Sequence, residues 1–262
     1  MTTLLVIGGG KMGEALVSGL LAASWAPEAE LAIVEKIPAR REELVARFPG
    51  ATVSADAVAA DGVVVAVKPG DVEAACRAAA AVGAGRLLSI AAGVRLADLE
   101  AWAGPKLPVV RAMPNTGAMV GAGAAAIAPG SSASDDDMAW AESVLRAVGT
   151  VVRVPEHLLD AVTGLSGSGP AYVFLVAEAL TEAGVLAGLP RDVSAGLTVQ
   201  TLLGASRLLS ESGEGPEALR AAVTSPGGTT AAGLQALERH GVRAAFLDAV
   251  VAATERSRQL GS

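Results

Sequence analysis

Residues 4–13 of the chain, LLVIGGGKMG, join a short apolar run to a cluster of glycines. The apolar run has the length of a buried strand, and residues 12–23 behind it show helical periodicity. Gly8, Gly10 and Gly13 have the G-x-G-x-x-G spacing, in which the first glycine makes a tight turn, the second admits a pyrophosphate and the third lets helix and strand pack closely. Because the motif stands between a strand and a helix, residues 8–13 are predicted to form a dinucleotide-binding loop.

Apolar runs alternate with helical patterns as far as residue 154. Strands are predicted at residues 4–7, 31–34, 63–67, 87–90, 108–111, 124–128 and 151–154, and helices at 12–23, 39–47, 72–82 and 135–148. Continuous apolar strands that alternate with helices indicate a parallel sheet covered on both faces. We therefore expect residues 1–154 to form a Rossmann-like, doubly wound α/β domain.

The sequence changes character after Pro155. Helical patterns broken by glycine and proline follow at residues 156–163, 170–187, 191–212, 216–223, 229–240 and 242–260, with no strand pattern. Residues 171–186 are apolar nearly all round, which is typical of a helix that packs against a partner as well as its own domain. Residues 155–262 are therefore predicted to form a second, all-α domain.

Composition excludes several classes of function. The net charge of −7, without a basic tract, argues against nucleic acid as a partner. The one cysteine, Cys76, has no partner for an internal disulfide, which favours a reducing, cytoplasmic compartment. It lies among alanines, so we expect its side chain to be a small buried hydrophobe. We expect no signal peptide, no membrane span and no metal site.

Three further strand ends carry small or polar residues. In doubly wound sheets, ligands lie beyond the carboxyl ends of the strands. Such positions are occupied by residues 66–69, residues 91–93 and Asn115. Because three strand ends of this kind occur together, a nicotinamide site is favoured over three ordinary turns. The predicted lining residues are Ala66, Val67, Lys68, Pro69, Ala91, Ala92, Gly93 and Asn115.

The end of the second strand carries opposing signals about the cofactor. An acidic residue such as Glu35 normally binds the adenine ribose hydroxyls and favours NAD, whereas nearby arginine favours the 2′-phosphate of NADP. Lys36, Arg40 and Arg41 follow Glu35. The two arginines fit a solvated helix face, paired with adjacent glutamates, as well as they fit a phosphate site, so this segment leaves the preference open.

Residues 225–230, SPGGTT, place two glycines and three hydroxyls directly before the helical pattern of residues 231–240. Glycines let the backbone approach a ligand closely, and a helix start offers free N–H groups to an anion. The stretch is therefore a candidate pocket for a carboxylate or a phosphate, facing the nucleotide.

These motifs together resemble pyrroline-5-carboxylate reductase, essentially from end to end. The resemblance rests on GGGKMG at 8–13, AVKP at 66–69, RAMPN at 111–115, LSGSGPAY at 165–172 and VTSPGGTT at 223–230. It implies a helical domain that interlocks with its twofold mate, as a homodimer that assembles into larger rings in many members. It also implies reduction of the cyclic imine 1-pyrroline-5-carboxylate to L-proline, the last step of proline biosynthesis, with NADPH favoured and NADH also accepted.

The resemblance implies roles for individual residues. The glycine loop, with Gly9, Lys11 and Met12, should hold the pyrophosphate, and Asn115 should lie near the nicotinamide. Thr230 should hydrogen-bond to the ring nitrogen, and the residues expected around the substrate are Ser225, Gly227, Gly228, Thr229 and Thr230. Some relatives have an asparagine before the turn where this chain reads AAV at 221–223, so a contact made there is in doubt.

The chemistry of an imine explains the scarcity of acidic catalysts. A protonated imine loses charge in the transition state, so positioning carries much of the acceleration, and a threonine hydroxyl that orients the nitrogen or relays its proton suffices. The substrate carboxylate would be held by N–H groups at the start of the 229–240 helix. His157 and His240 lie outside any motif and are predicted at the surface or at helix ends. Tyr172 is predicted to fill a helix contact.

Two alternative functions compete with this interpretation. β-Hydroxyacid dehydrogenases have a motif similar to G-x-x-G-x-G, followed by a lysine and, one helical turn later, an asparagine. Gly164, Gly167 and Gly169 fit the glycines, but Val173 and Ala177 take the polar positions, so proton transfer has no agent and this alternative is rejected. A non-catalytic NADP-binding protein would be expected to have lost the SPGGTT turn, which is intact.

Overall fold

The computed structural model describes residues 2–261 and divides the chain into two compact units. The first unit contains the residues up to Ser168 together with those from Val251 onward, and the second contains Gly169–Val250. The eight strands of the fold all lie in the first unit, and the second is helical.

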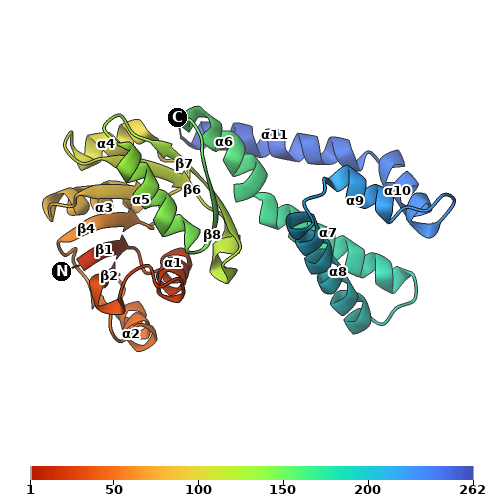
Figure 1. Ribbon diagram of the computed structural model, residues 1–262, viewed down its shortest axis with the longest axis horizontal. Helices are drawn as coiled ribbons and strands as arrows, with labels where there is room; N and C mark the ends of the chain where they lie inside the picture. Colours follow the sequence, from red (N-terminus) through yellow and green to blue (C-terminus); the bar gives the residue numbers. More distant parts are fainter. Residues whose placement is uncertain (1, 262) are drawn as a thin grey trace. The chain divides into compact units, whose positions relative to one another are not determined.

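An eight-stranded sheet forms the centre of the first unit (Figure 1). Its spatial order is β3-β2-β1-β4-β5-β6-β7-β8, and the first six strands are parallel in the 3-2-1-4-5-6 order of a doubly wound fold. The strands are β1 (Thr2–Ile7), β2 (Leu31–Val34), β3 (Thr52–Ser54), β4 (Ala60–Val65), β5 (Arg86–Ser89), β6 (Val109–Met113), β7 (Gly123–Pro129) and β8 (Gly149–Arg153). The predicted Rossmann-like class is confirmed.

The sheet departs from the predicted all-parallel arrangement at one edge. β7 pairs antiparallel with β6, and β8 is parallel to β7. Only a short 3₁₀ helix, Thr116–Val120, separates β6 from β7, and a parallel return needs a longer crossover. The helix α5 (Asp135–Arg146) supplies such a crossover between β7 and β8.

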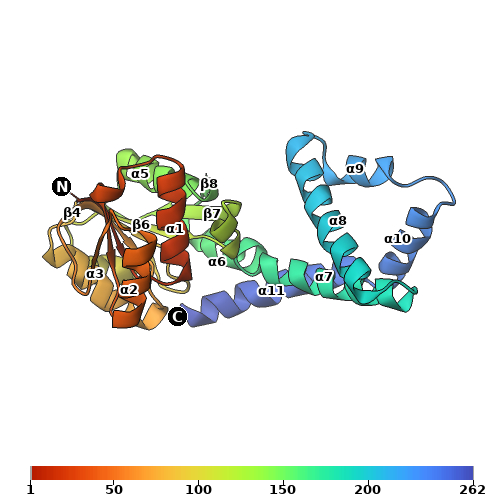
Figure 2. The same cartoon turned by 90° about the horizontal axis from the view of Figure 1, so that it is seen from below.

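Helices cover both faces of the sheet (Figures 1 and 2). Alternate side chains of β1 enter opposite cores: Leu4 and Val6 pack with residues of α1 (Lys11–Ala22), α2 (Pro38–Arg47) and α5. Leu5 and Ile7 pack with residues of α3 (Val72–Ala81) and α4 (Leu96–Ala103). Burial on both faces is why the parallel strands read as continuous apolar runs.

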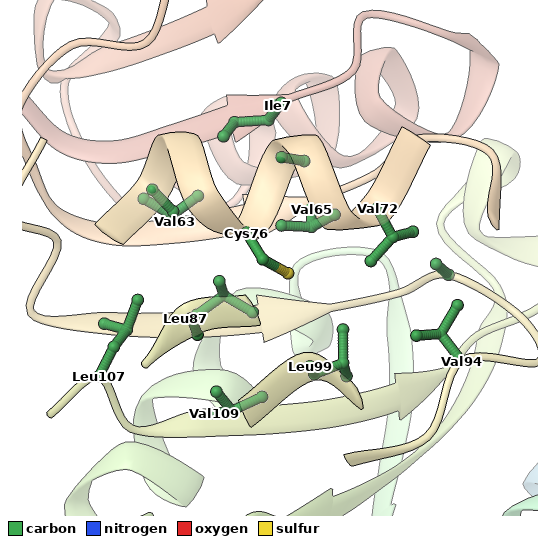
Figure 3. Close-up of a cluster of buried hydrophobic side chains, with 14 of the residues drawn as sticks. Ile7, Val63, Val65, Val72, Cys76, Leu87, Val94, Leu99, Leu107 and Val109 are labelled. Atoms are coloured by element: carbon green, nitrogen blue, oxygen red, sulfur yellow. The ribbon is translucent and has the colours of Figure 1, made fainter. Parts of the chain in front are cut away.

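Cys76 lies in the core between α3 and the sheet. It is fully buried, and Figure 3 shows its sulfur among Val65, Val72, Leu87 and Leu99. Burial raises the pKa of the thiol to about 11, so the thiolate that a nucleophile needs is disfavoured. The prediction that Cys76 is a small buried hydrophobe is confirmed.

The division between the units differs from the expected one near residue 154. A 3₁₀ turn (Glu156–Leu158), α6 (Leu159–Val162) and a π-helical turn (Thr163–Gly167) remain in the first unit, where α6 contacts β6 and β7. The end of the last helix, α11 (Val242–Leu260), also belongs there, and Ser257 Oγ donates a hydrogen bond of 2.7 Å to Asp160 Oδ1. These long-range contacts leave no trace in local composition.

The second unit has very little core of its own. It contains α7 (Gly169–Leu186), α8 (Arg191–Glu211), α9 (Pro216–Ala222), α10 (Thr229–Arg239) and the first part of α11. α7 and α8 pack together, and Ser194 Oγ donates to the carbonyl of Thr181 at 2.7 Å. Yet Ser194 and Thr198 are the only buried residues in 169–250. Most large apolar side chains of this unit, Phe174 and Leu175 among them, are exposed.

One helical stretch within residues 2–261, Glu156–Leu186, has the length and apolar composition of a membrane span, although no span was expected. Glycines and Pro170 interrupt the apolar run in the sequence. The π-helical turn Thr163–Gly167 bridges this interruption, so the helical path continues into α7.

Candidate functional site

The glycine loop between β1 and α1 has little room for side chains at three of its four glycines, Gly8, Gly9 and Gly13. Gly8 has φ = +115° and donates its N–H to the carbonyl of Val34 at 2.9 Å. A Cβ on Gly13 would lie 2.0 Å from the carbonyl oxygen of Gly8, so this glycine permits close packing of helix against strand. A Cβ on Gly10 would meet nothing within 4 Å, and Gly10 precedes the first turn of α1. The loop therefore offers open space in front of helix N–H groups, which suits a pyrophosphate.

A cavity of about 550 Å³ opens at the carboxyl ends of β1, β2 and β4. The predicted site residues that line it are Gly8, Gly10, Glu35, Lys36, Ala66, Val67 and Lys68. Its size and mixed lining, with two lysines beside apolar groups, suit a nucleotide. The open space at Gly10 and the Glu35 carboxylate at the end of β2 thus fit a dinucleotide cofactor.

The other predicted cofactor residues do not line this cavity. Gly9, Lys11, Met12 and Gly13 belong to the glycine loop and the first turn of α1. Pro69 opens the 3₁₀ turn Pro69–Asp71, and Ala91–Gly93 follow the end of β5. Asn115 follows the end of β6.

The sequence prediction missed part of the cavity wall. Ala55, Asp56 and Ala57 line it after β3, a strand of only three residues whose apolar signal is too short to recognise. One face of α3 contributes the small side chains Ala74, Ala75 and Ala78. The alanine-rich composition of residues 74–81 could have indicated this part of the wall, because small side chains leave space for a ligand.

Four charged residues after β2 have distinct environments. Glu35 Oε1 accepts a hydrogen bond of 2.9 Å from the N–H of Ile37, which holds the carboxylate at the end of the strand. Arg41 Nη1 donates to the carbonyls of Glu35 and Lys36, each at 2.9 Å. The Lys36 side chain is 73% exposed, and its one ion pair within residues 2–261 is a long one, 3.7 Å, with Asp71.

The Arg40 side chain forms hydrogen bonds with the glycine loop and with its flanking helices, α1 and α2. Its Nε donates to the carbonyl of Gly9 at 2.8 Å, Nη1 donates to Glu43 Oε2 at 2.6 Å, and Nη2 donates to Glu14. Hydrogen bonds with Glu43 and Glu14 raise the pKa of the guanidinium above its usual value. Arg40 therefore links α2 to the loop. Its positive charge is balanced by two glutamates, so no cofactor phosphate is needed to explain it.

Asn115 connects three segments through its side-chain amide. Its Oδ1 accepts from the N–H of Gly117 at 3.2 Å and from the N–H of Ala124 at 3.1 Å. Its Nδ2 donates to the carbonyl of Ser166, in the π-helical turn, at 3.1 Å. The amide thus fixes the turn after β6, the start of β7 and the π-helical turn at once.

The SPGGTT turn lies in the second unit and leads into α10, whose first two residues are its threonines. The N–H of Gly228 donates to the carbonyl of Ser225 at 3.0 Å, and Gly227 has φ = +69°. Gly228 is the N-cap residue of α10, and no side chain caps this helix end. The first N–H groups of α10, at Thr229 and Thr230, therefore face outward from an uncapped, partly positive helix end.

The histidines lie where they were predicted. His157 is exposed in the 3₁₀ turn before α6, and His240 is exposed directly after α10. Both positions agree with surface or helix-end residues.

Comparison with known proteins agrees with both halves of this description. Residues 156–260 match the family described as pyrroline-5-carboxylate reductase dimerisation, and residues 3–93 match the family described as NADP oxidoreductase coenzyme F420-dependent. A pyrroline-5-carboxylate reductase of Synechocystis is 46% identical over 98% of this chain and 97% of its own. One of Arabidopsis thaliana is 41% identical over 97% of this chain and 94% of its own.

Solved structures extend the similarity to the whole fold. A pyrroline-5-carboxylate reductase of Coxiella burnetii superposes with a TM-score of 0.94 at 35% identity, covering 100% of this chain and 99% of that one. A pyrroline carboxylate reductase of Plasmodium falciparum with NADP bound superposes with a TM-score of 0.85 at 29% identity, covering 100% and 98%. Sequence relatives that match over nearly their full length, together with these folds, show that the chain belongs to the pyrroline-5-carboxylate reductase family.

Proposed function

We propose that this protein transfers hydride from NAD(P)H to the C=N bond of 1-pyrroline-5-carboxylate and so forms L-proline, in the last step of proline biosynthesis. The observation that carries the proposal is 46% identity with a pyrroline-5-carboxylate reductase over 98% of the chain. The glycine loop before α1 and the SPGGTT turn before α10 are both intact, which supports the same activity.

The nicotinamide cofactor supplies the hydride, and the first unit supplies its binding groups. We assign the pyrophosphate to the loop Gly8–Gly13, where open space at Gly10 meets the N–H groups of α1. Glu35 and Lys36 would receive the adenosine end, since both line the cavity at the end of β2. The Ala66–Pro69 and Ala91–Gly93 segments would line the dinucleotide beyond β4 and β5.

We propose NADPH as the preferred cofactor, with NADH also accepted. Lys36 is the group we assign to the 2′-phosphate, because its exposed ion pair with Asp71 contributes little and leaves the ammonium free to turn. Arg40 and Arg41 are less suited, since their N–H groups already bind Gly9, two glutamates and two backbone carbonyls. Glu35 beside them suits ribose hydroxyls and explains tolerance of NADH.

Substrate would bind at the start of α10. The uncapped N–H groups of Thr229 and Thr230 suit the substrate carboxylate, which the helix dipole also favours. Ser225, Gly227 and Gly228 form the turn that exposes this helix end, and the glycines let a ligand approach the backbone. A small cyclic amino acid suits this site, because its carboxylate can bind the N–H groups while the nearby hydroxyls reach its ring.

Thr230 is the residue we assign to the ring nitrogen. Hydride addition to a protonated imine removes positive charge and builds no oxyanion, so a strong general acid is not required. A hydroxyl that orients the nitrogen, or passes it a proton, meets this limited demand. The exposed His157 and His240 are therefore not needed as catalysts.

The dimerisation match over residues 156–260 explains the exposed apolar helices. We propose that these helices pack against a second copy and not against a membrane, and that dimers associate further into rings. A cytoplasmic location is proposed on the single buried cysteine, which has no disulfide partner within the chain.

The deciding experiment is a nicotinamide absorbance assay with 1-pyrroline-5-carboxylate, run with NADPH and with NADH. We expect oxidation of the cofactor that depends on the imine, and a higher kcat/KM with NADPH. Binding of the cofactor without turnover would instead identify a non-catalytic NADP-binding protein.

A further inference from the structure

A buried arginine sits in the core on one side of the sheet. Arg111 is only 7% exposed and belongs to β6, where it faces the same side as the core residue Val109 two positions earlier. A buried cation requires a counter-charge. Glu156 provides it: Arg111 Nη1 donates to Glu156 Oε1 at 2.8 Å.

The same carboxylate oxygen caps a helix. The N–H of Leu96, the first residue of α4, donates to Glu156 Oε1 at 2.7 Å. The residue before it, Arg95, is the N-cap and makes no side-chain cap, so α4 has no local cap of its own. Glu156 thus replaces a missing local cap from 60 positions away in the sequence, and its charge suits the helix end.

The start of α4 is the end of a loop that the proposed function assigns to the cofactor. Residues 90–95 join β5 to α4, and Ala91 and Val94 are buried while Gly93 has φ = +76°. The end of α11 lies against the same loop, since a Cβ on Gly93 would approach Leu260 to 3.8 Å. The loop is therefore contacted by Leu260 and anchored at its α4 end by Glu156, and neither of these residues lines the cavity.

We propose that Glu156 is a positioning residue for the cofactor site. Its carboxylate oxygen sets the first turn of α4, and hence the Ala91–Gly93 loop, while Arg111 holds the carboxylate in place. This proposal rests on the assignment of that loop to the dinucleotide. It does not require Glu156 to touch cofactor or substrate.

A pair of double variants separates the hydrogen bond to Leu96 from the ion pair. Arg111→Met/Glu156→Gln removes both charges but keeps an oxygen that accepts from Leu96. Arg111→Met/Glu156→Leu removes the charges and the acceptor together. Both avoid the uncompensated buried charge that a single substitution would leave, which is the change most damaging to folding.

Two measurements on the dimeric protein test the role. Hydrogen exchange without cofactor reports the Leu96 amide, and NADPH fluorescence reports the Kd. We expect the Leu variant to exchange at Leu96 at least about tenfold faster, and to bind NADPH about tenfold more weakly, than the Gln variant. Equal exchange rates, or faster exchange with an unchanged Kd, would overturn the proposal.

Glu100→Gln is the matched control. Glu100 lies on the same helix and accepts from the N–H of Ser131 and, at 2.8 Å, from its hydroxyl. Ser131 follows β7 near the start of β6, at the amino ends of the parallel strands, whereas the cavity opens at their carboxyl ends. We expect the NADPH Kd of this variant to equal that of the unsubstituted protein. Neither readout involves turnover, so an inactive unsubstituted protein that binds NADPH would count against the proposed reductase and not against Glu156.

Discussion

At the scale of single residues, hydrogen bonding decides which charges after β2 can meet a cofactor. Arg40 and Arg41 stand at positions typical of NADP-binding proteins, yet their donors are directed to Gly9, to glutamates and to the carbonyls of Glu35 and Lys36. Among the described residues, the Lys36 ammonium pairs with Asp71, and this ion pair is exposed. The residue type alone does not reveal this difference, because it depends on partners in α1 and in the loop.

Cofactor preference therefore should respond to Lys36 and not to the arginines. Lys36→Ala removes the proposed 2′-phosphate contact, and we expect the ratio of kcat/KM for NADPH to that for NADH to fall about tenfold. Arg40→Ala/Arg41→Ala loosens the glycine loop, so we expect both cofactors to lose kcat/KM to a similar degree. A changed ratio in the arginine variant with an unchanged ratio in the lysine variant would reverse the assignment.

The proposed role of Thr230 predicts a loss confined to catalysis. Thr230→Ala removes the hydroxyl near the ring nitrogen, and we expect kcat to fall about 100-fold while the Kd for NADPH stays within about twofold. Thr230→Ser keeps the hydroxyl and should retain most of the activity. Steady-state kinetics and fluorescence titration measure the two quantities, and parallel loss of NADPH affinity would show that Thr230 belongs to the cofactor site.

At the scale of elements, the β1–α1 junction separates two uses of glycine. Gly13 serves the fold, because a Cβ there would lie 2.0 Å from the carbonyl oxygen of Gly8. Gly10 has open space around it, and the proposed role of this space is to receive the ligand. Both positions belong to the same sequence motif, but one substitution should affect stability and the other should affect binding.

Substitution by alanine at each position tests this separation. Gly13→Ala forces α1 away from β1, and we expect it to lower the free energy of unfolding by about 2–3 kcal/mol. Gly10→Ala should leave the Tm of the cofactor-free protein unchanged but raise the Kd for NADPH at least about tenfold, since its methyl group occupies the pyrophosphate cradle. Thermal unfolding and fluorescence titration provide the two readouts. A Gly10→Ala protein with normal affinity would place the pyrophosphate elsewhere.

At the scale of the whole molecule, the second unit is not a self-sufficient domain. Residues 169–250 bury only Ser194 and Thr198, while long helices expose Phe174, Leu175 and many other apolar side chains. Such surfaces are normally covered, and the dimerisation match over residues 156–260 identifies a second copy as the cover. Stability of this region should therefore depend on protomer concentration.

A charge on the exposed apolar face of α7 tests this dependence. Phe174 is 63% exposed, and Phe174→Lys should weaken dimerisation by about 30-fold or more, because a lysine would be buried without a partner. Val45→Lys on α2, at a position 51% exposed in the first unit, is the matched control and should remain dimeric. Analytical ultracentrifugation over a range of concentrations measures both. An unchanged Phe174→Lys dimer would place the interface on other helices.

Much of the architecture could be predicted because its signals are local. Apolar runs such as Leu31–Val34 located the strands, and glycine or proline punctuation located α7 to α11. Two elements were missed: β3 is only three residues long, and α4 is an eight-residue helix without a local side-chain cap. The spacing of Leu96, Leu99 and Ala103, all buried on one face, was the signal that identifies α4.

The sequence by itself determined the fold class, the glycine loop, the helix start after the SPGG turn and the family, since each depends on neighbours along the chain or on motif identity. Only the tertiary structure decided the antiparallel edge at β7, the inclusion of residues 156–168 in the first unit, and the partners of Arg40, Asn115 and Glu156. Those features depend largely on contacts between residues far apart in the sequence, such as the hydrogen bonds of Asn115 with Ala124 and of Leu96 with Glu156. Such bonds form only after hydrophobic burial has brought distant segments together, so no local pattern records them.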